Sequence, residues 1–353
     1  MTGELKHKII DSITQNEDEE YCFKLCDGKC PMLDDNGLCE IHKNLGEDYL
    51  GVVCKQFPRY SEYYGTIKES GIGLACEEAA RIILSENRPF SMETAACDEE
   101  YEPSSEYDSS FALQIFAARE AVFKILAKES LSIHEKLIVI LDMGSKIQQC
   151  INTDEYDNIK SVVNDYLKEG IAHTLDETRN LSDSGQFEDI SLQQGIRQIL
   201  YPYEEMEVLN PEWEVILKDI IDSLFEQMSD EEYNILNEEF GTYMVSRAYE
   251  YRQLLEYLVF RYFAKSIYDY DFLGKCQMLV TNFFVIRQMD IIRWLDNHRE
   301  YSFKDRMDVV HIFSRQVEYS EDNIENLYED FIFDDIFKTD SLIAILWIDS
   351  ENI

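Results

Sequence analysis

Cysteine is concentrated in one short stretch of this 353-residue chain. Six of the nine cysteines lie between Tyr21 and Cys76, and these are Cys22, Cys26, Cys30, Cys39, Cys54 and Cys76. Thiolates that gather in a loop-rich segment can bind a soft metal ion, hold an iron–sulfur cluster or close disulfides. This stretch is therefore the first candidate for chemistry in the sequence.

The backbone between these cysteines is expected to reverse direction several times. Turn-forming residues interrupt it at Asp27-Gly28, Pro31, Asn36-Gly37 and Gly46, and such turns can bring separated cysteines together. The cysteine spacing matches neither the paired CxxC of a zinc ribbon nor a ferredoxin run. A Cys39–His42 pair can also bind zinc, so the pattern predicts a metal centre without identifying the metal.

The composition indicates a cytoplasmic protein that folds without disulfides. Apolar residues make up 45% of the chain and can form a full core. The sequence contains neither a signal-peptide pattern nor an apolar run of about 18 residues, so we expect no membrane span. In a reducing cytosol, a cysteine cluster is more often metal-binding or redox-active than disulfide-forming.

The chain carries a large excess of negative charge. It has 71 Asp and Glu against 32 Lys and Arg, which gives a formal net charge of -39. Such a surface repels nucleic acid and anionic lipid, so neither is expected as a partner. The field can attract a cationic substrate such as a lysine side chain, or it can serve solubility alone.

Three ordered sequence blocks contain the cysteines, and a fourth block lies further along the chain. They are CPMLDDNGLCEIHKNLGEDYL (Cys30 to Leu50), CKQFPRY (Cys54 to Tyr60), GIGLACEEAARIIL (Gly71 to Leu84) and YRQLLEYLVFRYFAKSIYDYDFLGKCQMLV (Tyr251 to Val280). Together these blocks resemble the flagellin lysine-N-methylase family, and the resemblance covers most of the chain.

The resemblance implies a cytoplasmic enzyme that transfers methyl groups from S-adenosylmethionine to lysine side chains of flagellin before export. It also implies an iron–sulfur cluster of the 4Fe-4S type at the cysteine motif. The positions that match the family signature are Cys30, Cys39, Cys54 and Cys76. Many members carry a further cysteine-rich segment upstream, which has no counterpart here, so either the N-terminus is shortened or Cys22 and Cys26 take its place.

Methylation of lysine places demands on the residues around the amine. A lysine has a reference pKa near ~10.4, so its proton must be removed before nitrogen can attack a methyl group. Aromatic walls and a carboxylate would assist, and Tyr60, Glu62, Tyr63 and Tyr64 follow Cys54 closely. This segment is a candidate substrate site, although the tyrosines can equally serve packing.

The binding site for S-adenosylmethionine is not evident from a motif. The 14 glycines never form GxGxG or GxGxxG, so a doubly wound methyltransferase is not expected. The Cys22-x3-Cys26-x3-Cys30 spacing is one residue longer than the CxxxCxxC of radical adenosylmethionine enzymes. Polar and radical mechanisms therefore both stay open, and no catalytic residue is assigned.

Helical periodicity dominates after the cysteine-rich part. We expect a mainly α protein in which a loop-rich cysteine module, residues 1–98, packs on an all-α domain, residues 99–353. The segments 243–266 and 272–298 are the most apolar and should form central helices. Cations interrupt these two segments at Arg252, Arg261, Lys265, Arg287 and Arg293, where they can pair with acidic residues or bind a cofactor carboxylate.

Two functions from different classes fit these observations. The first is an adenosylmethionine-dependent protein-lysine N-methyltransferase acting on flagellin, with an iron–sulfur cluster held by cysteine. The second is a non-catalytic scaffold or redox sensor, in which the same cysteines hold zinc or a cluster and the helices recognise a partner.

Overall fold

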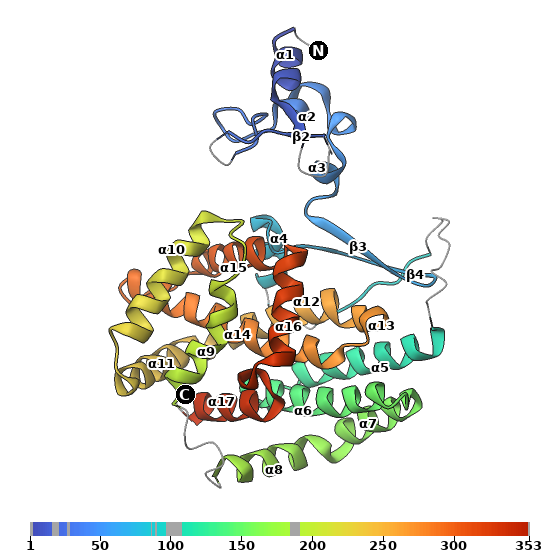
Figure 1. The fold of residues 1–353 in the computed structure, drawn as a ribbon, viewed down its shortest axis with the longest axis vertical. Coiled ribbons are helices and arrows are strands. Elements are labelled where there is room, and N and C mark those ends of the chain that lie inside the picture. The colour runs from blue at the N-terminus through green and yellow to red at the C-terminus, as the bar shows by residue number, and fades with distance from the viewer. Residues whose placement is uncertain are drawn as a thin grey trace. The chain divides into compact units, whose positions relative to one another are not determined.

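The chain forms two compact units in the computed structural model, Met1–Tyr60 and Ser61–Ile353 (Figure 1). The structure describes residues 3–15, 21–26, 29–85, 87–88, 90–96, 108–183 and 191–351. The expected boundary between residues 98 and 99 lies outside the described residues, as does Cys97, so this division stays a prediction.

The first unit consists of short elements joined by turns. Its elements are α1 (Gly3–Ser12), β1 (Ile13–Gln15), β2 (Tyr21–Phe23), α2 (Glu40–Leu45), η1 (Glu47–Tyr49) and α3 (Val52–Gln56). Strands β1 and β2 pair antiparallel, with Thr14 opposite Cys22. Gly37 and Gly46 have φ angles of 76° and 92°, which glycine adopts more readily than other residues, so the turns expected there are confirmed.

A β-hairpin that was not expected follows the cysteine-rich segment. Strands β3 (Arg59–Tyr64) and β4 (Ile67–Ile72) form a two-stranded sheet, and Gly65 turns the chain with a φ of 60°. Alternating side chains in RYSEYY and IKESGI, separated by Gly65-Thr66, are the signal that predicts this hairpin. Helix α4 (Glu77–Leu84) comes next.

Helices make up the rest of the second unit. They are α5 (Ser109–Leu126), α6 (Ile133–Asn152), α7 (Ile159–Asp165), α8 (Ile171–Asp183), α9 (Leu192–Glu204), α10 (Pro211–Ile220), α11 (Asp230–Met244), α12 (Ala248–Tyr262), α13 (Ser266–Asp269), α14 (Phe272–Asp296), α15 (Phe303–Val317), α16 (Glu321–Phe333) and α17 (Thr339–Glu351). Short 3-10 or π turns join them at η2 (Tyr156–Asn158), η3 (Tyr166–Gly170), η4 (Ile221–Glu226), η5 (Val245–Arg247), η6 (Phe263–Lys265) and η7 (Asp335–Phe337). The mainly α fold is confirmed.

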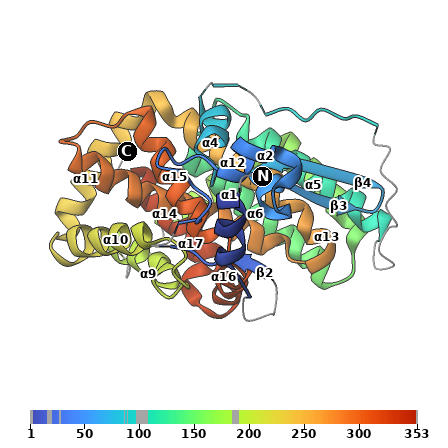
Figure 2. The ribbon, with the colours of Figure 1, turned by 90° about the horizontal axis from the view of Figure 1, so that it is seen from above.

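Helix α14 is the centre of the second unit. It is buried along almost its whole length and contacts α6, α10, α12 and α15 (Figure 2). Its buried charged side chains are paired, as in Arg287–Asp349 and Arg306–Asp290. In the other segment, α12 is likewise mostly buried and contacts α14, so the prediction that 243–266 and 272–298 form central helices is confirmed. Helix α17 also packs on α6, and its LIAILW segment lies in the core.

Local signals located several helix ends correctly. Capping boxes begin α6 at Ser132 and α15 at Ser302, and the Asn210 side chain caps α10. Glycine often follows the last residue of a helix, but Gly170 does not end one, because the chain continues through a π turn into α8. A Cβ at Gly170 would lie 3.0 Å from the Asp165 carbonyl oxygen, so close approach rather than termination accounts for this glycine.

Most of the cations in the two central segments pair with acids, as expected. The pairs are Arg252–Glu256, Arg261–Glu318, Lys265–Glu62 and Arg287–Asp349. Arg293 forms no ion pair with any carboxylate in the described ranges. None of the helices that the structure describes is long and apolar enough to cross a bilayer.

Candidate functional site

Tight turns position the cysteines of the first unit. The backbones of Cys26 and Lys29 form an isolated antiparallel β-bridge. The Cys30 carbonyl accepts a hydrogen bond from the Leu33 amide at 3.2 Å. Cys39 lies opposite Leu33 at the start of α2, whereas Cys54 lies within α3. These elements are too short to be stable alone, so the turns fix where the thiols lie.

Cys30, Cys39 and Cys54 lie close enough to interact electrostatically. Burial raises the pKa of the Cys54 thiol, and the neighbouring Cys30 and Cys39 raise it further. A thiol with a raised pKa stays protonated at neutral pH unless a cation is bound nearby, because a bound metal ion stabilises the thiolate. The donor chemistry of these three residues therefore suits a soft metal or an iron–sulfur cluster.

The structure does not by itself complete a metal site. Within the described ranges, no group of three Cys, His, Asp or Glu side chains has an arrangement that could hold a metal ion. Cys22 and Cys26 are exposed, and His42 is also exposed. Cys76 belongs to the second unit. The full ligand set of Cys30, Cys39, Cys54, Cys76, Cys26 and Cys22 stays a prediction.

Cys76 is held against the helices of its own unit. It lies at the N-terminal end of α4, and the preceding Leu74 amide donates a hydrogen bond to the Tyr257 hydroxyl at 3.4 Å. Tyr257 lies in the block 251–280 and Leu74 in the block 71–84. The structure thus brings together two blocks on which the family resemblance depends.

The buried carboxylate of Glu318 holds Tyr257, which contacts the segment that precedes Cys76. Glu318 Oε2 accepts hydrogen bonds from the hydroxyls of Tyr257, at 2.8 Å, and Tyr262, at 3.0 Å, and Arg261 Nε lies 3.1 Å from the same oxygen. Burial, reinforced by the Glu318 charge, raises the pKa of Tyr262 well above its usual value. Both hydroxyls donate to Glu318, and the Tyr257 oxygen accepts from the Leu74 amide. These contacts fix the position of the segment that precedes Cys76.

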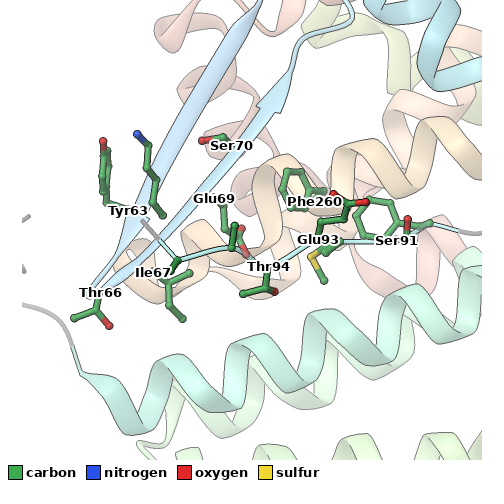
Figure 3. Close-up of a pocket in the computed structure, with 15 residues that line it drawn as sticks. Tyr63, Thr66, Ile67, Glu69, Ser70, Ser91, Glu93, Thr94 and Phe260 are labelled. Carbon is green, nitrogen blue, oxygen red and sulfur yellow. The ribbon is translucent and has the colours of Figure 1, made fainter. Parts of the chain in front are cut away.

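A pocket of about 680 Å³ lies beside the hairpin (Figure 3). Aromatic side chains of Tyr63, Phe90 and Phe260 line it together with the carboxylates Glu69 and Glu93. Its volume falls within the ~300–1,000 Å³ typical of ligand sites. Aromatic faces and carboxylates in one cavity suit a cationic group.

Two cationic side chains of the protein, Arg119 and Lys68, already contact residues that line this hairpin pocket. Arg119 binds Glu69 through two hydrogen bonds, of 2.7 and 2.5 Å, and its guanidinium carbon lies 5.7 Å from the centre of the Phe260 ring. Lys68 places its ammonium 5.4 Å from the Tyr63 ring centre. Because Arg119 neutralises Glu69, Glu93 is the carboxylate more available to a ligand.

The tyrosine-rich segment divides between the pocket and the core. Tyr63 lines the pocket, but Tyr64 is buried and stacks on Tyr268 with ring centres 5.9 Å apart. Burial raises the pKa of Tyr64 far above its usual value, so Tyr64 cannot act as a base near neutral pH. Glu62 pairs with Lys265. Packing therefore accounts for Tyr64, whereas Tyr63 contributes to the lining of the pocket.

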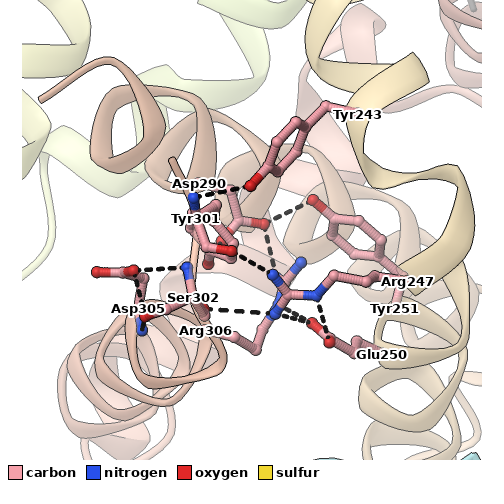
Figure 4. A network of polar contacts seen from close by, with 9 residues as sticks. All are labelled: Tyr243, Arg247, Glu250, Tyr251, Asp290, Tyr301, Ser302, Asp305 and Arg306. Carbon is pink, nitrogen blue, oxygen red and sulfur yellow. Dashed lines mark hydrogen bonds and ion pairs between the residues drawn. The ribbon is translucent and has the colours of Figure 1, made fainter. Parts of the chain in front are cut away.

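A buried polar network joins α12, α14 and α15 (Figure 4). Arg306 donates from Nε to Glu250 at 3.0 Å and from Nη1 to Asp290 at 2.6 Å. Asp290 also accepts from the hydroxyls of Tyr251 and Tyr301. The sequence alone does not reveal this network, because its ion-paired members lie on separate helices and no local motif marks them. These side chains are buried between the helices that carry them, so we assign the network a structural role.

Comparison with known proteins identifies the family. Residues 119–345 match the model of the FliB lysine N-methylase C-terminal domain. A 59-residue segment, 17% of this chain, is 37% identical to the flagellar biosynthetic protein FliU of Salmonella muenchen, of which it spans 35%. It is equally similar to the lysine-N-methylases of Salmonella typhimurium and Salmonella choleraesuis, spanning 15% of each. No solved structure matches the chain.

The family model covers more than half of the chain, from the middle of α5 into α17. The resemblance noted in the sequence is thereby confirmed at the level of the family. The chain belongs to the family defined by the FliB lysine N-methylase C-terminal domain.

Proposed function

We propose that this chain is an S-adenosylmethionine-dependent protein-lysine N-methyltransferase whose substrate is flagellin. The observation that carries the proposal is membership of the lysine N-methylase family over residues 119–345. The relatives named lysine-N-methylase and flagellar biosynthetic protein point to the same chemistry and to a flagellar substrate. The reaction would take place in the cytoplasm, where flagellin is available before export.

The cysteine-rich segment would supply an inorganic cofactor. Cys30, Cys39 and Cys54 would hold an iron–sulfur cluster, with Cys76, Cys26 and Cys22 as the further candidate ligands. Such a cluster, when bound, supplies an iron site that can accept amino and carboxylate groups. Burial raises the pKa of the Cys54 thiol, and Cys30 and Cys39 raise it further. This proximity of three thiols supports the assignment, because a bound cation stabilises the thiolates.

The hairpin pocket is our candidate for the acceptor lysine. Tyr63, Phe90 and Phe260 would hold the lysine side chain by packing and cation–π attraction, and partial desolvation would lower the amine pKa. Glu93, which lines the same pocket, would accept the ammonium proton. The freed nitrogen pair then forms a bond to the methyl carbon while the carbon–sulfur bond of the sulfonium breaks, giving S-adenosylhomocysteine.

The test is methyl transfer by protein purified without oxygen. Purified flagellin is incubated with the full chain and isotopically labelled S-adenosylmethionine, and label on lysine is located by peptide mass spectrometry. Flagellin with chemically blocked lysines is the matched control. Label on unblocked lysines alone supports the proposal. No transfer by iron-loaded protein would reject it, and a colourless protein with one bound zinc would favour the non-catalytic scaffold.

A further inference from the structure

A second concave site on the helical unit is lined by charges of both signs. It is a groove of about 560 Å³, within the range of small-molecule sites. Its charged residues come from four helices and are Glu77, Glu212, Arg293, Asp308 and Arg315. None of these residues lines the hairpin pocket, so the mixed-charge groove is a separate site.

The two arginines of this groove differ from most arginines in the second unit. Arg119, Arg261 and Arg306 each bind a carboxylate within 3.1 Å. Across the described parts of the chain, neither Arg293 nor Arg315 forms an ion pair within 4.0 Å, although carboxylates far outnumber cations. Two guanidinium groups thus lie in a concave site with their donors uncommitted to carboxylates.

Helix geometry explains how these side chains share the groove. Asp308, His311, Ile312 and Arg315 follow one another at intervals of three, one and three residues along α15. Residues three and four apart lie on the same helix face, so these side chains form one stripe. Val215 on α10, 60% exposed, and its neighbour Ile216 add apolar surface to the groove.

An unsatisfied polar atom lies in the same lining. The His311 ring hydrogen-bonds to the Ala75 backbone, whereas its Nδ1 is buried and has no hydrogen-bond partner among the described residues. Buried polar atoms normally have a partner, which can be a ligand or water. An imidazole that donates through its other nitrogen presents Nδ1 as an acceptor, which suits an N–H donor on a ligand.

The charges exclude ligands of a single sign. A phosphate would face repulsion from Glu77, Glu212 and Asp308, and a polyamine would face repulsion from the two arginines. We propose that the groove binds an α-amino-acid zwitterion, whose carboxylate lies between Arg293 and Arg315. The ammonium then faces the three carboxylates and His311 Nδ1, while an apolar side chain covers Val215, Ile216 and Ile312.

This inference goes beyond the proposed function and does not depend on it. A free amino acid and the amino-acid end of S-adenosylmethionine present the same two charged groups. Isothermal titration calorimetry of the full chain with L-methionine, S-adenosylhomocysteine and adenosine distinguishes these sources. Binding of methionine indicates a free amino acid, and binding of S-adenosylhomocysteine alone indicates the larger ligand. Binding of adenosine with equal affinity, or of no probe at millimolar concentration, overturns the proposal.

Substitutions and modified ligands locate the binding site. Arg315→Gln and Arg293→Gln should each weaken binding roughly ten- to hundredfold, because each removes hydrogen bonds to a charged group. Arg299→Gln is the matched control, since Arg299 pairs with Glu239 and does not line the groove. Methionine methyl ester, which lacks the carboxylate charge, should bind wild-type protein with a similar loss.

The results of these binding measurements do not depend on whether the chain has methyl-transfer activity. Circular dichroism confirms that each variant remains helical, and the methyl-ester arm uses only wild-type protein. Unchanged affinity in Arg293→Gln and Arg315→Gln, or equal affinity for methionine and its methyl ester, overturns the proposal. Binding that follows the expected pattern in protein without methyl-transfer activity supports this site while rejecting the proposed function.

Discussion

Arg306 and Asp290 form an ion pair inside the helical unit, with 2.6 Å between Nη1 and Oδ2 and both side chains almost completely buried. Burial alone raises the pKa of Asp290, whereas Arg306 and the hydroxyls of Tyr251 and Tyr301 oppose that rise. The pair joins α15 to the central α14, and Glu250 extends the connection to α12. Helices α12, α14 and α15 are thereby held in one arrangement.

Replacement of Arg306 should destabilise the fold strongly. Arg306→Met leaves Asp290 without its cation, whereas Glu250 keeps its pair with Arg247. Removal of one partner from a buried ion pair costs about 3–5 kcal/mol. We expect this loss in the free energy of unfolding, measured by urea denaturation followed by circular dichroism. Arg299→Gln removes an exposed pair with Glu239 and should cost about 0–1 kcal/mol. Equal losses in both variants would contradict the role given to the buried network.

Replacement of Cys54 should lower the metal content. Cys54 interacts with Cys30 and Cys39, so Cys54→Ser removes a donor from the candidate centre. We expect iron and sulfide per chain to fall sharply in protein purified without oxygen. Cys150→Ser is the matched control, because Cys150 lies in α6, outside the cysteine-rich segment, and should keep the wild-type content. A similar fall in both variants would show that the cysteines were divided wrongly.

The sequence predicted those features that local patterns determine. The capping boxes at Ser132 and Ser302 and the largely apolar α14 each follow from residues close together in the chain. The orientation of α5 does not follow from spacing alone: Leu113 lies at helical spacing from Phe116 and Ala117, yet it is 68% exposed. Helical spacing identifies an apolar face only when neighbouring helices are known.

The candidate site was predictable only in part. Turn residues correctly indicated the chain reversal between Cys30 and Cys39, where Gly37 has a φ of 76°. The alternating residues around Gly65 would have identified the hairpin. The pocket also needs Phe260 from α12, which no local pattern connects to Tyr63. Similarly, the ion pair between Arg306 and Glu250 joins residues 56 positions apart, and sequence alone does not show that they are neighbours.

Removal of the Tyr63 ring should weaken substrate binding more than it slows chemistry. Tyr63 lines the hairpin pocket and already lies 5.4 Å from the Lys68 ammonium. A cation–π contact at an exposed site contributes about 0.5–1 kcal/mol, so Tyr63→Ala should raise KM for flagellin roughly two- to fivefold with kcat little changed. Tyr201→Ala, an exposed tyrosine on α9, is the control. A normal KM in Tyr63→Ala would exclude this pocket as the lysine site.

Stability should fall in acid because of Asp349. Burial alone would raise the pKa of this carboxyl, but Arg287 and His134 lower it to about 2, with His134 Nε2 only 2.6 Å from Oδ2. Because the folded pKa lies below the unfolded value near ~3.9, the stabilisation is complete above pH ~4 and is lost as pH falls toward 2. The depressed pKa corresponds to about 2–3 kcal/mol.

Asp349→Asn separates this contribution from the general effect of acid. The free energy of unfolding is measured by urea titration at pH 7, 5 and 3 for wild type and variant. At pH 7 and 5 the wild type should be more stable by at least about 2 kcal/mol, because the variant also leaves Arg287 without its counterion. The difference in the free energy of unfolding should shrink at pH 3, because Asp349 is then largely protonated in the unfolded wild-type chain. A difference that stays constant from pH 7 to pH 3 would show that Asp349 is not ionised in the folded protein.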